Sequence, residues 1–238
     1  MEVHFKELKR KARQLGLLYV IWILTGLYAL IYIPPRTVVA GDAAATAGKI
    51  LANEFLFRTG IVNSIISGAI WVLLALLIDR LFRHVSGSHA KLLVSLVLVQ
   101  VPVMFLIEAL NLTSLMIFKG EILKTVDAGQ RQGLALLFIE INGYASSVLE
   151  TFWGLWLLPF AWLVFHSGFI PRILGVFLLL NGITLVIHSF STILFPEYQE
   201  IVRTVSTPFW ILGEVVFALW ILIIGVRPPR KKSSNETS

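Results

Sequence analysis

Long apolar segments alternate with short polar intervals along the whole chain. A helix that crosses a bilayer needs about 20 largely apolar residues, at about 1.5 Å per residue. Five segments meet this requirement directly, and a sixth is longer than one perpendicular crossing needs. We therefore predict spans at 16–34, 56–79, 92–118, 133–165, 170–195 and 207–226. Pro159 predicts a kink in the long fourth span, because proline removes a helical hydrogen bond.

The interval "GDAAATAGKILANEFLFR", at 41–58, is too polar to cross a bilayer but is rich in helix-forming residues. Asp42 is a good N-cap, and the residues that follow it predict a helix over about 42–54. Its small residues suit close packing on neighbouring backbones. A weaker version of the pattern, "VDAGQRQGLALLF", joins the third and fourth spans. The pattern thus predicts short capped helical segments on one side of the membrane.

Composition supports this membrane interpretation. The chain has 238 residues, of which 57% are hydrophobic and only 14% charged, and its mean hydropathy is +0.82. A soluble domain carries about 45–50% apolar and about 25% charged residues. The fold class is therefore all-α, a polytopic membrane bundle of six transmembrane helices in the lipid bilayer. The absence of cysteine excludes disulfides and thiolate chemistry.

The basic residues predict the orientation. A basic leader covers 1–15, the membrane domain covers 16–226, and a basic tail covers 227–238. With the N-terminus inside, thirteen of the 20 Lys and Arg residues face the cytoplasm and seven face outward. Positive charge favours the inner side, so we expect a multi-pass protein of the cell membrane with both termini cytoplasmic and the 42–54 helix outside. The net charge of +6 lies beside apolar spans, which indicates contact with anionic lipid and no nucleic-acid partner.

Two stretches carry a family resemblance. "GDAAATAGKILANEFLFR" and "HSGFIPRILGVFLLLNG", at 166–182, resemble the hallmarks of a bacterial membrane-protein family catalogued as domain of unknown function 4386. The likeness runs from the first span to the last. It implies an integral membrane protein of six helices, and it implies no catalytic residues.

Polar side chains recur on single faces of several spans. In the fifth span Asn181, Thr184, His188 and Ser191 follow steps of three and four residues, and the fourth span repeats this from Glu140 through Tyr144. Lipid does not satisfy such groups, so they are expected to face the bundle interior. The position of each residue along its span indicates that these side chains lie in the outer half of the bilayer. The residues predicted to line an outward-facing polar pocket are Arg58, Asn63, Glu108, Asn111, Glu140, Tyr144, Asn181, His188 and Glu214.

The helix at 42–54 is placed by this reasoning over the pocket, as its cover or part of its wall. The alternative is an interfacial packing helix with no gating role. Both interpretations remain open at the level of the sequence.

Three functions fit these residues. The first is binding or transport of a small neutral or cationic solute, or of a lipid, because three carboxyls outnumber the facing cations His188 and Arg58. The second is a non-catalytic structural or sensory role, in which polar residues join helices. The third is an intramembrane metal-dependent enzyme, although no HExxH or Gly-x-Ser-x-Gly motif is present. The sequence assigns no catalytic residue, cofactor, metal ligand or oligomeric state.

Overall fold

The computed structural model describes residues 2–227, and every regular element in that range is a helix. In chain order these are α1 (Glu2–Leu27), η1 (Tyr28–Tyr32), α2 (Pro34–Thr37), α3 (Ala43–Ala52), α4 (Glu54–Phe82), α5 (Gly87–Phe118), α6 (Ala128–Leu155), α7 (Leu157–Ser167), α8 (Arg172–Leu194), η2 (Pro196–Tyr198) and α9 (Gln199–Ile223). The basic tail predicted at 227–238 lies outside the described residues, apart from Arg227. The residues of the basic leader continue as one helix, α1, into the first apolar segment.

Six helical stretches in the described part of the chain are long and apolar enough to cross a membrane. They cover Phe5–Thr37, Glu54–Phe82, Gly87–Phe118, Ala128–Ser167, Arg172–Leu194 and Pro196–Ile223. The predicted all-α bundle of six helices is confirmed, and the protein is a multi-pass membrane protein. The helices exceed several of the predicted spans because they continue beyond the most apolar residues at their ends.

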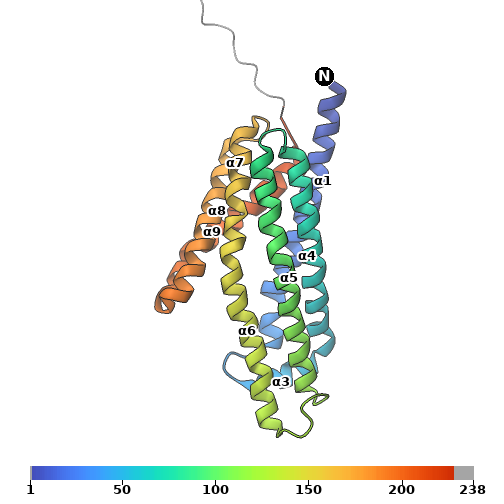
Figure 1. Cartoon of the computed structure of the whole chain (residues 1–238), viewed down its shortest axis with the longest axis vertical. Coiled ribbons are helices and arrows are strands. Elements are labelled where there is room, and N and C mark those ends of the chain that lie inside the picture. The colour runs from blue at the N-terminus through green and yellow to red at the C-terminus, as the bar shows by residue number, and fades with distance from the viewer. Residues whose placement is uncertain (1, 228–238) are drawn as a thin grey trace, which may run out of the picture.

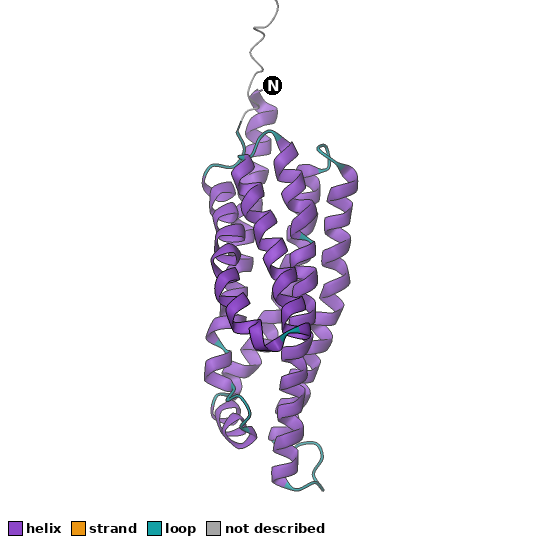
Figure 2. Cartoon of the chain, turned by 90° about the vertical axis from the view of Figure 1, so that its left-hand side faces the viewer, coloured by secondary structure: helices purple, strands orange, loops and turns teal. Residues whose placement is uncertain are grey.

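The six long stretches form an elongated ring (Figures 1 and 2). Around it, α1 packs on α4, α4 on α5, α5 on α6, α6 on α8, α8 on α9, and α9 on α1. One end, the proximal end, holds the start of α1 and the α4–α5 and α7–α8 connections (Figure 1). The opposite, distal end holds α3 and the α5–α6 connection. Figure 1 also shows α8 and α9 leaning away from α6 towards the turn that joins them.

The fourth stretch is interrupted where the sequence predicts a kink. α6 ends at Leu155 and α7 begins at Leu157. Pro159 lacks the N–H that would donate to the Leu155 carbonyl, and its ring crowds that oxygen, so a continuous α-helix is disfavoured at this point. Pro102, by contrast, lies inside α5 without ending that helix.

Aromatic side chains fill the main hydrophobic core. Trp22, Trp71 and Trp156 contact one another with ring centroids 5.2 to 6.1 Å apart. Tyr19 packs on the same cluster, and Phe160 joins it to Phe217 at 4.8 Å. Buried aromatic rings contribute large contact areas, and they hold α1, α4, α7 and α9 together here.

A second, smaller hydrophobic cluster lies beneath α3 at the distal end. Asp42 caps α3, because its Oδ1 accepts a hydrogen bond from the Ala45 nitrogen at 2.8 Å. Ala47 and Ile50 are buried against a cluster that includes Leu115 on α5 and Ala135 on α6. The capped helix predicted at 42–54 is therefore present as Ala43–Ala52, and its buried face favours the packing interpretation.

The second predicted capped segment is not a separate helix. Asp127 does cap, since its Oδ2 accepts from the Gly129 nitrogen at 2.8 Å. The helix that begins there is α6 itself, which continues without interruption to Leu155. The predicted capped segment is therefore the first part of α6, which packs on α5.

The α6–α8 contact depends on facing glycines. A Cβ on Gly154 would overlap the Gly182 carbonyl oxygen and lie 2.7 Å from Val186 Cγ2. A Cβ on Gly182 would lie 2.8 Å from the Gly154 oxygen. Small residues of this kind let two membrane helices approach at backbone distance.

The substitution Gly154→Ala is expected to destabilise the fold by about 1–3 kcal/mol, because the added methyl group has no room. Gly143→Ala on the same helix is the matched control, since a Cβ there meets nothing within 4 Å. Alanine exceeds glycine in helix propensity by about 1 kcal/mol, so the control should keep or raise the melting temperature. Thermal unfolding in detergent measures both, and equal effects of the two changes would contradict this packing.

Candidate functional site

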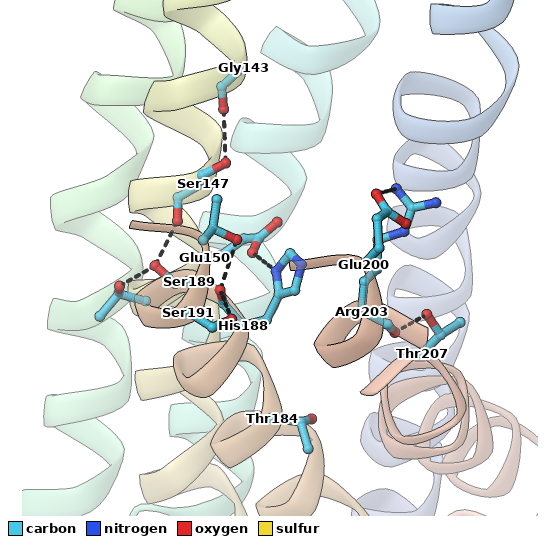
Figure 3. A network of polar contacts seen from close by, with 12 residues as sticks. Gly143, Ser147, Glu150, Thr184, His188, Ser189, Ser191, Glu200, Arg203 and Thr207 are labelled. Atoms are coloured by element: carbon cyan, nitrogen blue, oxygen red, sulfur yellow. Dashed lines mark hydrogen bonds and ion pairs between the residues drawn. The ribbon is translucent and has the colours of Figure 1, made fainter. Parts of the chain in front are cut away.

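A histidine–carboxylate pair joins α6 and α8 within the bundle (Figure 3). His188 Nδ1 lies 2.6 Å from Glu150 Oε2, and the histidine is only 4% exposed. The Trp210 ring of α9 meets the imidazole edge-on, with centroids 5.1 Å apart. His188 Nε2 is buried and has no hydrogen-bond partner among the described residues. The pair therefore presents one ring nitrogen that no protein group satisfies.

Hydroxyl groups beside this pair fix how α6 lies against α8. Ser189 Oγ donates to the Ser147 carbonyl at 2.7 Å, and it lies 2.7 Å from Thr151 Oγ1. Figure 3 shows Ser147, Ser189, Glu150 and His188 gathered along the two helices. Because the bonds come from neighbouring positions, a shift of either helix by one turn would break them together.

A second polar contact joins α1 and α9. The Tyr19 hydroxyl donates to Glu214 Oε1 at 2.6 Å, and Tyr19 is fully buried. Asn181 of α8 packs against the same region, where a Cβ on Gly213 would lie 2.5 Å from Asn181 Cβ. The Asn181 side chain is fully buried beside Glu214, and neither its nitrogen nor its oxygen makes a hydrogen bond of normal geometry within the described residues.

These contacts lie along one interface. Asn181 and His188 are seven residues apart, which places them on one face of α8 about two turns from each other. Trp210 and Glu214 are likewise one turn apart on α9. We call this set the polar axis; it comprises Tyr19, Glu150, Asn181, His188, Trp210 and Glu214.

Another group of predicted residues lies on the far side of the ring, between α1, α4 and α5. Asn111 Nδ2 donates to Glu108 Oε2 at 3.0 Å on α5. Asn63 Nδ2 donates to the Thr25 carbonyl of α1 at 2.9 Å. Thr25 in turn donates from its hydroxyl to Ser67 Oγ at 2.9 Å. Asn63, Thr25 and Ser67 join α1 to α4, and within residues 2–227 no hydrogen bond or ion pair links this group to the polar axis.

Arg58 does not face either group. Its Nε donates to Glu54 Oε1 at 2.8 Å, near the start of α4. Lys119, just beyond α5, bridges Glu54 at 3.2 Å and Glu121 at 2.9 Å. The bonds to Glu121 and Glu54 raise the pKa of Lys119 above its usual value. Arg58 thus belongs to a surface ion-pair network at the distal end.

Glu140 and Tyr144 are exposed, although they continue the face of α6 that carries Ser147 and Thr151. Ser189 lies opposite 147–151, and α8 has only five more residues, so at about 1.5 Å per residue it ends near the level of Tyr144. Glu140 lies a turn farther along, past the end of α8. Because α8 also leans away (Figure 1), nothing covers Tyr144, which is 69% exposed.

The predicted site omits three members of the polar axis, namely Tyr19, Glu150 and Trp210, of which Tyr19 and Glu150 make its hydrogen bonds to Glu214 and His188. Glu150 lies next to Thr151 but is off the polar face of α6 that runs through Glu140 and Tyr144. Tyr19 lies in an apolar segment, where its hydroxyl is the one sign that it needs a partner. Both pairings cross between helices far apart in sequence, so spacing along one helix does not reveal them.

The residues that match a known family cover most of the chain. The model of the family described as Domain of unknown function (DUF4386) matches residues 15–225. The chain belongs to the DUF4386 family. The resemblance predicted from "GDAAATAGKILANEFLFR" and "HSGFIPRILGVFLLLNG" is confirmed, since both lie within the match. No curated protein and no solved structure matches this chain.

The chemistry available to this DUF4386 protein follows from the side chains of the polar axis. One imidazole, one phenol and one amide are buried along α8 and α9, beside the half-buried carboxyls of Glu150 and Glu214. Such groups bind hydrogen-bonding partners and hold protons. Within residues 2–227 no three His, Cys, Asp or Glu side chains are close enough to hold a metal ion.

In this DUF4386 protein, Tyr19→Phe is expected to lower stability by about 1–3 kcal/mol, because Glu214 loses its buried donor. Tyr144→Phe is the control and should change stability by less than about 0.5 kcal/mol, since its side chain is exposed. A double-mutant cycle with Glu214→Gln should give a coupling energy of about 0.5–3 kcal/mol. Strictly additive effects in thermal unfolding would show that Tyr19 and Glu214 do not interact.

Proposed function

We propose that this protein binds a small polar solute, neutral or cationic, at the polar axis between α6, α8 and α9. The observation that carries the proposal is that four of the eight buried side-chain nitrogen and oxygen atoms without partners in the described residues belong to the polar axis: His188 Nε2, both polar atoms of Asn181, and Trp210 Nε1. Buried polar groups in folded proteins nearly always have a hydrogen-bond partner, which is either protein, water or a ligand. A solute that donates and accepts hydrogen bonds would satisfy these atoms.

The charge of the region decides which solute is favoured. Glu150 and Glu214 belong to the polar axis, and His188 is its one titratable base. Arg58, the other cation predicted to face the pocket, is bound to Glu54. An anionic solute would therefore meet two carboxyls with little compensating charge, whereas a cation or a neutral hydrogen-bonding molecule is compatible with them.

A purely structural role is the second candidate, and specific contacts favour it. Several polar side chains bond across helices and satisfy one another, including Asn63 with Thr25 and Thr151 with Ser189. Interhelical hydrogen bonds of this kind contribute about 0.6 kcal/mol each on average. This role explains the satisfied pairs but not the unpartnered atoms of His188 and Asn181. A metal-dependent enzyme is not proposed, since the described residues bring no three ligands together.

The binding proposal predicts that native mass spectrometry of wild-type protein, released from mild detergent, shows a bound small molecule. His188→Ala should lose that mass. Glu150→Gln should weaken binding of a cation by about tenfold or more, because it removes a half-buried carboxylate while keeping the side-chain shape. Thr184→Ala is the matched control, since the Thr184 hydroxyl bonds only to the Leu180 and Asn181 carbonyls of its own helix.

Melting temperatures of the same samples separate the two candidate functions. Binding predicts that Thr184→Ala keeps the bound mass and that adding the identified molecule stabilises wild type but not His188→Ala. If wild type carries no bound molecule and both His188→Ala and Glu150→Gln lower the melting temperature, the structural role replaces the binding proposal. Metal analysis of the same samples tests for a stoichiometric metal lost with His188→Ala.

We further propose that the protein lies in the cell membrane with both termini in the cytoplasm, which places the distal end and the nearby part of the polar axis on the outer side. The excess of Lys and Arg at the proximal end supports this orientation. α3 and the α5–α6 connection would then lie outside the cell.

Because the chain has no cysteine, single cysteines report this orientation directly. Thr125→Cys, in the exposed α5–α6 connection, should react with a membrane-impermeant maleimide on intact cells. Ser88→Cys, exposed at the proximal start of α5, should react only after the cells are permeabilised. The reverse labelling pattern would overturn the orientation.

A further inference from the structure

A basic hollow lies on the proximal part of α1, away from the polar axis. It has a volume of about 390 Å³ and is open to the surface. Four cations of α1 line it, namely Lys6, Lys9, Arg10 and Arg13, and Leu17 and Leu222 line its apolar side. No Asp or Glu is among the residues that line it.

Backbone contacts between α1 and α9 hold the walls of this hollow. A Cβ on Gly16 would lie 2.5 Å from the Leu222 nitrogen, so glycine allows α9 to approach α1 closely at this level. Arg13 donates from its guanidinium to the Ile223 carbonyl at 2.9 Å, where α9 ends. That bond also places a positive charge beside the negative end of the α9 dipole. The hollow is therefore a fixed feature of the α1–α9 contact.

The lining changes from charged to apolar along α1. Lys6 to Arg13 form the charged part, and Leu17, one turn beyond Arg13, is 53% exposed to the surroundings. In a bilayer, long basic side chains lie at the headgroup level and exposed leucines contact acyl chains. The hollow thus spans the boundary between headgroups and hydrocarbon.

We infer that this hollow binds one anionic phospholipid. Its phosphate would lie among Lys9, Arg10 and Arg13, and an acyl chain would run along Leu17 and Leu222. Clusters of Lys and Arg beside a membrane helix attract anionic lipids. A free phosphate would use the cations but leave the apolar wall uncovered. A zwitterionic lipid would bring its own positive charge into a hollow that lacks carboxylates.

The test compares lipids retained by the full chain in native mass spectrometry, after exchange into phosphatidylglycerol or phosphatidylcholine. Wild type is expected to retain phosphatidylglycerol in preference to phosphatidylcholine. The triple variant Lys6→Gln, Lys9→Gln, Arg10→Gln should lose this preference by about 10- to 100-fold in affinity. Arg13 is left unchanged because it bonds to α9.

The matched control is the triple variant Lys11→Gln, Arg80→Gln, Lys91→Gln, which removes equal charge from the proximal end outside the hollow. It should retain phosphatidylglycerol as wild type does. Equal losses in the two triple variants would overturn the proposal, as would equal retention of the two lipids. Displacement of the lipid by inorganic phosphate at similar concentration would instead indicate a simple anion site. If the first triple variant does not fold, the single change Arg10→Glu, at an exposed position, is measured against Lys11→Glu.

Discussion

Hydrocarbon offers no hydrogen-bond partners, and this constraint shapes the rest of the structure. Each polar side chain within the bundle must find its partner on another helix, on its own backbone, or in a bound molecule. The cross-helix bonds of Tyr19 with Glu214, Thr151 with Ser189, and Asn63 with Thr25 therefore coincide with the contacts that order the ring. Glycines complete the arrangement, since Gly154 and Gly182 bring α6 and α8 close enough for their hydroxyls to meet. Of the buried polar atoms that this network leaves unpaired among residues 2–227, those of Asn181, His188 and Trp210 lie between α8 and α9, where binding is proposed.

Two hydrophobic clusters and several polar contacts pack the helices together at different levels along the bundle. The aromatic core around Trp22, Trp71 and Trp156 joins four helices and fixes α1 against α9. The small cluster beneath α3 closes the distal end. The Glu108–Asn111 pair lies on α5, which contributes to both clusters, and the Glu150–His188 pair joins α6 to α8. Here α8 and α9 lean away from α6 (Figure 1), so the distal half combines polar side chains with incomplete helix contact. A solute-binding site and an anionic-lipid site would then occupy separate places, one between α6, α8 and α9 and one at the start of α1.

The sequence was sufficient for the helices and for part of the site. Apolar length predicts six spans, Asp42 predicts the start of α3, and Pro159 predicts the break in the fourth stretch. Helical periodicity also selected Asn181 and His188 as one face of α8, which the structure places against α9. Periodicity does not give the register between helices, however. Glu140 shares its stripe with Thr151, yet α8 ends before reaching it, while Glu150 lies beside that stripe and pairs with His188. The hydrogen-bond partner of Tyr19 lies 195 residues away in sequence, so no pattern within one helix predicts the pair.

The most direct test of the binding account is a crystal structure of the wild-type protein in a lipidic mesophase, at a resolution that shows ordered water and small ligands. The account predicts non-protein density within about 3.2 Å of His188 Nε2, reaching the Asn181 side chain, with Glu150 still bonded to His188 Nδ1. The account would be contradicted if protein groups were bonded to His188 Nε2 and to the Asn181 side chain. It would also be contradicted if apolar side chains packed against both and no non-protein density were present.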